Sequence, residues 1–209
     1  MMISPETFYE MNLKGKTKEQ IMTVIRGLKR EIGRLKNIME HPKYSSREWV
    51  IHPGEDVQIS MSREYLKQAK QALEEAGGTY VPSAAEKKAM DFEDNIPYIN
   101  KVAFCAGIHM GPYKTKTITV VDDKVHIASS SSETEEMDKE EFLEAFKNLH
   151  IGEWRKNYNT QRFGVWVMDG TYWHLEIYFS NGHRAIKIDG DNAYPYNFDQ
   201  LLELFEIEE

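Results

Sequence analysis

Few residues in this chain are able to do chemistry, and the best placed of them alternate along one stretch near the C-terminus. His174 and Glu176 lie two positions apart, so a strand would place them on the same face. Asp189 follows an Asn181-Gly182 turn, and an aspartate that orients a histidine is half of a general-base arrangement. These three residues are the catalytic candidates, although no nucleophile motif accompanies them. The alternative interpretation is that they form polar cross-strand pairs.

Candidate metal ligands and cofactor motifs are also sparse. The seven histidines show no H-x-x-x-H or H-E-x-x-H spacing, and the single cysteine, Cys105, cannot build a zinc cluster. The one candidate metal grouping shares a loop region and consists of His41, His52, Glu55 and Asp56. No glycine-rich phosphate loop is visible, so we expect no cofactor.

Candidate binding surfaces are more numerous than catalytic motifs. One face of a predicted helix carries Arg26, Lys29, Arg30, Arg34 and Lys36, which indicates either a solvated surface or a nucleic-acid surface. An acidic run over residues 133–141 contributes Glu133, Glu135, Glu136, Asp138, Glu140 and Glu141. Such a run is typical of a solvated helix start, or of a docking strip for a basic partner. The aromatic candidates for anchoring a protein interface are Trp49, Trp154 and Tyr158.

The composition is that of a globular protein with an uneven charge distribution. The 209 residues are 41% hydrophobic and carry a net charge of −8. Residues 1–50 contain ten Lys or Arg against six Asp or Glu, a net charge of +4, which leaves −12 for the remainder. No apolar run approaches a membrane span, the N-terminus lacks a signal-peptide pattern, and the lone cysteine fits a reducing compartment. We therefore expect a cytoplasmic protein that does not contact a membrane.

The helical pattern lies in residues 1–95. A capping box at Thr17 and Gln20 opens an amphipathic helix over about 17–40. Further helices are predicted over about 62–76 and about 84–93, and Ser83 opens the last of them. Residues 1–16 and 41–60 are predicted to be a lead-in and a loop.

The strand pattern lies in residues 96–209. Strands are predicted over 98–108, 114–121 and 124–128, and a polar loop over 129–136. Asp138 is predicted to cap the next helix, and Asn197 together with Gln200 to cap the last one.

Two hairpins are predicted between those helices. The Asn181-Gly182 turn would pair Glu176 with Lys187 and His174 with Asp189. An Asp169-Gly170 turn would place Trp166 opposite Trp173 in a preceding strand.

The strand region also shows internal periodicity. Residues 96–150 and 163–207 match at an offset of 59, which places Asp122-Asp123 on Asn181-Gly182 and Ile118 on Ile177. This predicts two successive β-β-β-α units. The expected fold class is therefore α+β, with a mainly antiparallel sheet that carries helices on one face.

Two segments carry a resemblance to known sequences. The patterns W-x-L-x-I-x-Y-x-N-G, from Trp173 to Gly182, and G-x-N-A-Y-P-x-N-F, from Gly190 to Phe198, resemble a module of uncharacterised proteins from gut Firmicutes and their mobile elements. The segment RLKNIMEHPKY, from Arg34 to Tyr44, resembles the front half of such proteins. The resemblance implies an accessory or phage-associated setting and implies no activity.

Together these patterns favour a non-enzymatic protein-binding accessory factor of a mobile element or phage, with a host defence nuclease complex as one partner to consider. An overall acidic chain is a poor nonspecific binder of DNA. Two alternatives stay open. One is nucleic-acid binding through the basic face of the first long helix, and the other is an enzyme that uses His174 and Asp189.

Overall fold

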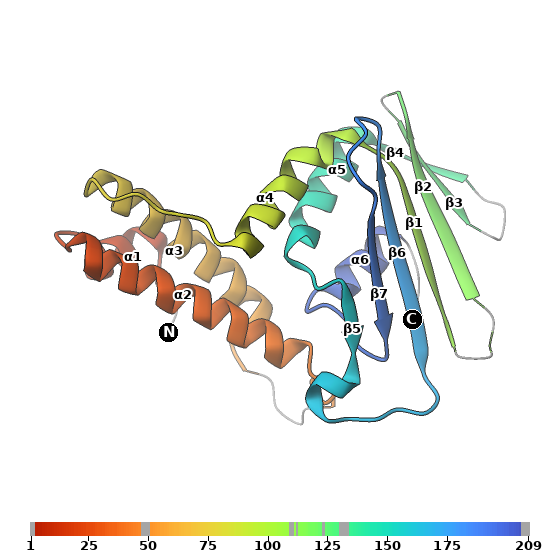
Figure 1. Cartoon of the computed structure of the whole chain (residues 1–209), viewed down its shortest axis with the longest axis horizontal. Helices are drawn as coiled ribbons and strands as arrows, with labels where there is room; N and C mark the ends of the chain where they lie inside the picture. The colour runs from red at the N-terminus through yellow and green to blue at the C-terminus, as the bar shows by residue number, and fades with distance from the viewer. Residues whose placement is uncertain are drawn as a thin grey trace. The chain divides into compact units, whose positions relative to one another are not determined.

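The structure is a computed structural model that describes residues 3–46, 51–108, 111, 113–122, 124–129 and 134–205. The chain divides into two units, Met1–Pro82 and Ser83–Glu209. The expected α+β fold class is confirmed, because helices precede a seven-stranded sheet that is mostly antiparallel (Figure 1). None of the described helices combines the length and the apolar character needed to cross a bilayer.

The first unit contains α1 (Pro5–Asn12), α2 (Lys18–Met39) and α3 (Glu55–Glu75). The predicted capping box of α2 is present, since Thr17 accepts from the Gln20 amide and Gln20 accepts from the Thr17 amide. Residues 1–16 were predicted to be a lead-in, yet α1 forms there because Ser4 caps it and Pro5 suits the first turn of a helix.

Helix α3 begins at Glu55, earlier than the predicted start near residue 62. Gly54 precedes it, and the acidic Glu55 and Asp56 occupy a first turn where negative charge is favourable. Inside this unit Ile21 and Ile25 share a core with α3, and Phe8 stacks on Tyr65 with ring centroids 4.1 Å apart.

The second unit opens with α4 (Ala84–Asn95), which starts at the predicted Ser83–Glu86 capping box. The predicted boundary at residue 95 grouped this helix with the helical region, whereas the structure groups it with the sheet. The physical reason is Phe92, which is 2% exposed and packs near the rings of Phe146 and Phe179. A short 3-10 turn, η1 (Ile96–Tyr98), leads from α4 into the sheet.

One sheet contains all the strands of the second unit in the order β4-β3-β2-β1-β6-β7-β5. The strands are β1 (Ile99–Ile108), β2 (Tyr113–Val121), β3 (Lys124–Ser129), β4 (Thr134–Asp138), β5 (Asn157–Asn159), β6 (Thr171–Phe179) and β7 (Ile186–Asp191). The remaining elements are α5 (Lys139–Asn148), the 3-10 turns η2 (Ile151–Glu153) and η3 (Thr160–Phe163), and α6 (Phe198–Leu204).

Helices α4, α5 and α6 cover one face of this sheet (Figure 1). Along β6 the odd-numbered residues from Trp173 to Phe179 are buried and the even-numbered ones are half-buried. Phe104 and Leu175, both fully buried, lie on the covered face in the core that includes Phe142 and Phe205. The side chains of the opposite face therefore include every even-numbered residue of β6.

The register predicted for the β6–β7 hairpin is confirmed, because Glu176 pairs with Lys187 and His174 pairs with Asp189. The turn itself differs from the expected tight form. Gly182 has a φ of 82°, whereas Asn181 does not have a positive φ, and the strands separate after Ile177 and before Ile186. The pattern of apolar residues, more than the turn type, thus defines this register.

Three expectations in this unit were wrong. The Asp169-Gly170 turn does not form a hairpin, and Trp166 lies in a connection instead of opposite Trp173. The third strand of the second half is β5, which pairs with β7 in parallel. The predicted loop over 129–136 contains the start of β4, an edge strand that pairs with β3.

The correspondence at an offset of 59 holds for part of the two halves. The β2–β3 and β6–β7 hairpins occupy matching positions, and Ile118 pairs with Ile127 as Ile177 pairs with Ile186. The first half is ordered β1-β2-β3-β4 across the sheet, but the second is ordered β6-β7-β5. Both halves share one sheet, but the first has an additional edge strand, β4, and the second places β5 beside β7.

Candidate functional site

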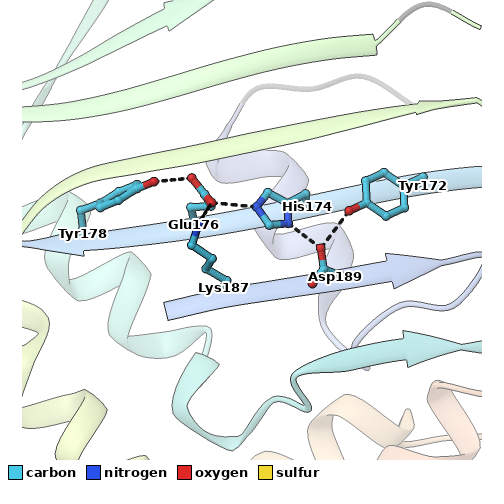
Figure 2. Close-up of polar contacts among 6 residues, drawn as sticks. All are labelled: Tyr172, His174, Glu176, Tyr178, Lys187 and Asp189. Carbon is cyan, nitrogen blue, oxygen red and sulfur yellow. Dashed lines mark hydrogen bonds and ion pairs between the residues drawn. The ribbon is translucent and has the colours of Figure 1, made fainter. Parts of the chain in front are cut away.

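Six side chains gather on the sheet face opposite the helices, and we call them the polar cluster (Figure 2). Four alternate along β6 and two project from the neighbouring strand β7. The members are Tyr172, His174, Glu176, Tyr178, Lys187 and Asp189. The even-numbered positions of β6 and the confirmed register bring them together.

His174 lies between two carboxylates. Its Nδ1 is 2.6 Å from Asp189 Oδ1, and its Nε2 is 3.1 Å from Glu176 Oε1. An ionised carboxylate only accepts hydrogen bonds, so both contacts are satisfied when both ring nitrogens carry a proton. Each ring nitrogen of His174 therefore lies within hydrogen-bond distance of a carboxylate oxygen.

The outer members of the polar cluster complete the hydrogen bonding of the two carboxylates. The Tyr172 hydroxyl donates to Asp189 Oδ1 at 2.8 Å, while Tyr178 and Lys187 both donate to Glu176. The hydrogen bond from Lys187, followed by those from Tyr178 and His174, lowers the pKa of Glu176 to about 2. Burial, followed by the hydrogen bond to Asp189, raises the pKa of Tyr172 to about 12.

This arrangement bears on the enzyme alternative. A histidine acting as a general base needs one ring nitrogen free to take a proton from substrate or nucleophile. Cys105 lies directly opposite His174 in the β1–β6 pairing, but both ring nitrogens of His174 already face carboxylates. Lys187 offsets the negative charge of Glu176, and the Tyr172 hydroxyl donates to Asp189. The polar cluster can thus stabilise the sheet without any catalytic step.

The signature segment from Gly190 to Phe198 has a structural role. A Cβ at Gly190 would come within 1.9 Å of Trp173 Nε1, so a side chain there would displace the indole. The Trp173 indole N–H donates to the Ala193 carbonyl at 2.9 Å. Asn192, with a φ of 53°, accepts from the Thr171 amide at 2.8 Å.

Asn197 occupies the N-cap position predicted for it at the start of the last helix, but the expected side-chain cap was wrong. Its side chain makes no capping hydrogen bond to α6. Instead Asn197 Oδ1 accepts from the Trp154 indole at 3.1 Å, and its Nδ2 donates to the Leu149 carbonyl at 2.8 Å. The buried side-chain amide of Asn197 thus links the segment that follows α5 to the start of α6.

The candidate metal residues do not form one open loop. Glu55 and Asp56 lie in the first turn of α3, and Glu55 is 4% exposed and accepts from the Tyr44 hydroxyl at 3.1 Å. His41 Nδ1 accepts from the Lys43 amide at 3.1 Å, and His52 precedes a cis proline. Within the described part of the chain, no group of three or more His, Cys, Asp or Glu residues is arranged as metal ligands.

The basic face of α2 is partly engaged. Arg26, Arg30 and Arg34 are exposed at a spacing of four, which places them on one stripe. Arg34 forms a two-pronged contact with Glu31, at 2.6 and 2.8 Å. Lys29 donates to the Tyr80 hydroxyl at 3.0 Å, and Lys36 is half-buried.

The acidic run 133–141 spans a strand and a helix start. Asp138 caps α5 as predicted, since its Oδ1 accepts from the amides of Glu140 and Glu141 at 2.8 and 3.2 Å. Glu140 and Glu141 are exposed in the first turn, where their charge is favourable. Glu133 lies outside the described residues, and for Glu135 and Glu136 the structure describes only the backbone, in β4.

The aromatic candidates require a correction. Trp154 and Tyr158 are each 2% exposed, and both rings pack against Trp173 in the core of the sheet unit, so neither can anchor an interface. Trp49 lies outside the described residues. Sequence reasoning could not tell the buried Trp154 from the exposed Trp166, because both lie in connections between regular elements.

Sequence reasoning also missed a strongly exposed apolar segment. Trp166 is 79% exposed, Val167 43% and Met168 92%, and we call these three residues the apolar loop. They lie between η3 and β6. The available signal in the sequence was Gly164, because glycine readily adopts a positive φ. Its φ is 71°, and the 3-10 turn ends there and leads into a connection that is not a strand.

Comparison of the chain with protein-family models, with the curated proteins and with the solved structures found no match.

Proposed function

We propose that this protein is a non-enzymatic, protein-binding accessory factor whose partner contacts the apolar loop. The observation that carries the proposal is the exposure of Trp166 and Met168, at 79% and 92%. Soluble proteins bury most large apolar side chains, and a contiguous exposed group is typical of a binding surface. Tryptophan also contributes more binding energy than most residues at protein interfaces.

The state of the polar cluster supports a binding role over a catalytic one. His174, the best candidate base, has carboxylates at both ring nitrogens, and each carboxylate has further donors. Chemistry at this site would first require one of these contacts to break. The apolar loop requires no rearrangement to meet a partner.

Within this proposal the setting is a mobile element or phage, and the partner is a component of a host defence nuclease complex. The setting is supported by the resemblance of the segments 173–182 and 190–198 to proteins of gut Firmicutes and their mobile elements. The partner class is supported by charge. Residues 83–209 contain thirteen Lys or Arg against twenty-three Asp or Glu, a net charge of −10. Nuclease complexes hold nucleic acid on basic surfaces, which attract such an acidic unit.

The test is site-specific photo-crosslinking in a gut Firmicutes host. A benzophenone amino acid is placed at Trp166 in one variant and at Val81, which is 75% exposed in the first unit, in a matched control. We expect a host protein to crosslink at position 166 and not at position 81. If neither position crosslinks, or both capture the same proteins equally, the proposed function is wrong. A captured nuclease component is then assayed for loss of target cleavage when the purified chain is added.

A second candidate function is nucleic-acid binding by α2, favoured by the exposed stripe of Arg26, Arg30 and Arg34. The measurement is fluorescence anisotropy with a labelled 20-base-pair duplex and a single-stranded RNA between 50 and 200 mM salt, concentrations at which phosphate contacts weaken by orders of magnitude. Charge reversal by Arg26→Glu and Arg30→Glu should abolish binding if this function is real. Wild-type affinity that is absent at 50 mM salt eliminates it.

A further inference from the structure

A cleft of about 550 Å³ lies between α4 and α5, the two helices that Phe92 and Phe146 hold together with ring centroids 6.3 Å apart (Figure 1). This volume falls within the range of clefts that bind ligands. Among the described residues its lining includes two apolar side chains and four charged ones: Ile96 and Leu143, and Glu93, Asp94, Glu144 and Lys147. We call it the α4–α5 cleft, and its charged lining consists of three carboxylates and one ammonium group.

The backbone adds to the negative charge of the α4–α5 cleft. Glu93 and Asp94 lie in the last turn of α4, and Lys147 lies in the last turn of α5. The C-terminal end of a helix carries a partial negative charge, which favours cations and disfavours carboxylates. Helix α5 follows this rule, whereas the last turn of α4 contains two carboxylates and no basic residue. Side chains and helix ends therefore both favour a cation in this cleft.

The protein itself neutralises these carboxylates only in part. Glu93 Oε1 is 3.9 Å from His150 Nδ1. The side chains of Asp94 and Glu144 are exposed, and neither forms an ion pair with any residue in the part of the chain that the structure describes. A carboxylate such as Asp94, placed against the helix dipole and left without a cation, violates a local folding rule, and such violations are typical of functional sites.

Other basic residues of this region do not fill the α4–α5 cleft. Lys88 and Lys139, at the other ends of the two helices, each donate to a backbone carbonyl at 3.2 Å. Lys87 in the first half of α4 and Arg184 in the β6–β7 connection are absent from its described lining. Among the described residues Lys147 is therefore the one basic side chain that lines it.

Charge and shape distinguish between the possible occupants. Nucleic acids and anionic lipids present phosphates, which carboxylates and a helix C-terminus repel. The described part of the chain contains no group of three or more potential metal ligands. A Lys or Arg side chain combines a cationic end with an apolar stem, so it complements the carboxylates and also Ile96 and Leu143.

We propose that the α4–α5 cleft is a docking site for a Lys or Arg side chain presented by a partner protein. Asp94 and Glu144 pair with the cationic end, and Ile96 and Leu143 contact the methylene stem. Charged pairs of this kind orient a partner and raise the rate of encounter. The inference rests on the proposed protein-binding function and adds to it a contact surface separate from the residues of the apolar loop.

The first test is an NMR titration of the isotope-labelled full chain with N-acetyl-arginine amide and with its neutral isostere, N-acetyl-citrulline amide. We expect saturable shifts at residues 93–97 and 143–148 with the arginine probe and none with the citrulline probe. The double substitution Asp94→Asn and Glu144→Gln should weaken binding about tenfold, because each removes a charge-assisted hydrogen bond. The matched control, Asp199→Asn with Glu203→Gln, removes two exposed carboxylates of α6 and should change affinity less than about twofold.

The second test uses the protein captured by the benzophenone at position 166. Its affinity for the full chain should fall about tenfold in the double variant of Asp94 and Glu144 and stay within about twofold in the α6 control. Asp94→Asn alone should leave the thermal unfolding midpoint unchanged or raise it, because the substitution removes a carboxylate from a helix C-terminus. A lowered midpoint would show that Asp94 serves the fold and would overturn its assignment to the docking site.

The failures can be told apart. Shifts that spread over the whole second unit, or that are equal for both probes, overturn the cleft as a site. A captured partner that binds the double variant as tightly as wild type overturns the inference while the protein-binding function stands. Self-association in light scattering that the double variant abolishes assigns the cleft to a second copy and overturns the proposal. If position 166 captures no protein, the proposed function and the partner both fail, and the titration alone decides whether the cleft accepts a basic side chain.

Discussion

Trp173 lies so close to Gly190 that a Cβ on the glycine would come within 1.9 Å of the indole Nε1. The two residues pair directly across β6 and β7, and the indole N–H reaches past the glycine to the Ala193 carbonyl. This contact explains the Gly190 position of the signature segment by packing. A structural role for that segment directs the search for function toward other surfaces.

Gly190→Ala should therefore destabilise the protein by about 1–3 kcal/mol, the usual cost of adding a methyl group to a packed core. The measurement is urea-induced unfolding followed by tryptophan fluorescence. The matched control is Gly27→Ala in α2, where a Cβ meets nothing within 4 Å. That substitution should stabilise the helix by about 0.5–1 kcal/mol. Equal effects of the two substitutions would contradict the packing explanation.

The bridging role of His174 predicts a cost for its removal. His174→Phe removes the ring contacts to Asp189 and Glu176 and should lower the free energy of unfolding by about 1–3 kcal/mol. Tyr172→Phe removes one hydroxyl that donates to Asp189, so its cost should be smaller, about 0.5–1.5 kcal/mol. Chemical denaturation at pH 6 measures both. A His174→Phe variant as stable as wild type would show that the cluster contributes no stability.

The lowered pKa of Glu176 predicts a pH dependence with a definite sign. Its folded value of about 2 lies below the value of about 4.3 for an unfolded glutamate. The stabilisation is therefore present above the unfolded pKa and is lost as the pH falls from about 4.3 toward about 2. Glu176→Gln should be less stable than wild type at pH 7, and the difference should shrink as the pH falls through this window. Unfolding curves at pH 7, 4.5 and 3 measure the effect, and a difference that stays constant with pH would refute it.

Asn197 predicts a large effect for a small substitution. Asn197→Ala leaves the Trp154 indole N–H and the Leu149 carbonyl without a partner in a buried site. Each unsatisfied group costs about 1–3 kcal/mol, so the variant should be destabilised by at least the lower value. Thermal unfolding by circular dichroism measures the change. Asn192→Ala, which removes hydrogen bonds to the Thr171 amide and to the Asp191 carboxylate outside the buried core, serves as the comparison and should cost less.

Trp154 is buried and Trp166 is exposed, and substituting each of them tests whether Trp166 belongs to the surface. Trp154→Ala should cost about 3–5 kcal/mol because the indole is 2% exposed and packs in the core. Trp166→Ala should change stability by less than about 0.5 kcal/mol because the indole is 79% exposed. Acrylamide quenching should correspondingly fall in the Trp166 variant. A strongly destabilised Trp166→Ala would place this side chain in the core and remove the basis for the proposed function.

Local rules predicted a good part of this fold. The capping boxes at Thr17 and Ser83 and the cap at Asp138 involve residues two to three positions apart, so their hydrogen bonds depend little on the rest of the chain. The pairing of His174 with Asp189 follows from apolar alternation on both sides of a short connection. The three catalytic candidates are therefore together, as expected, although the expectation said nothing of how Glu176 would contact the second ring nitrogen.

Other features depended on contacts between distant residues. Trp154 is buried, and its indole N–H is satisfied there by Asn197, which lies 43 positions away in the sequence. Strand β5 pairs in parallel with β7, and the turn signal at Asp169-Gly170 had predicted a hairpin instead.

The early start of α3 at Glu55 was missed for a local reason. Pro53 and Gly54, which precede it, are typical of loops as well as of helix starts.

The amino-acid sequence by itself determined the starts of α2, α4 and α5, the β6–β7 register and the polar character of one face of β6, because neighbouring residues decide these features. Only the tertiary structure decided that β5 closes the sheet beside β7, that Trp154 and Tyr158 are buried and that Trp166 is exposed. The physical reason is that burial depends on which distant surfaces meet. The same residue type in two similar connections can therefore belong to the core or to the binding surface.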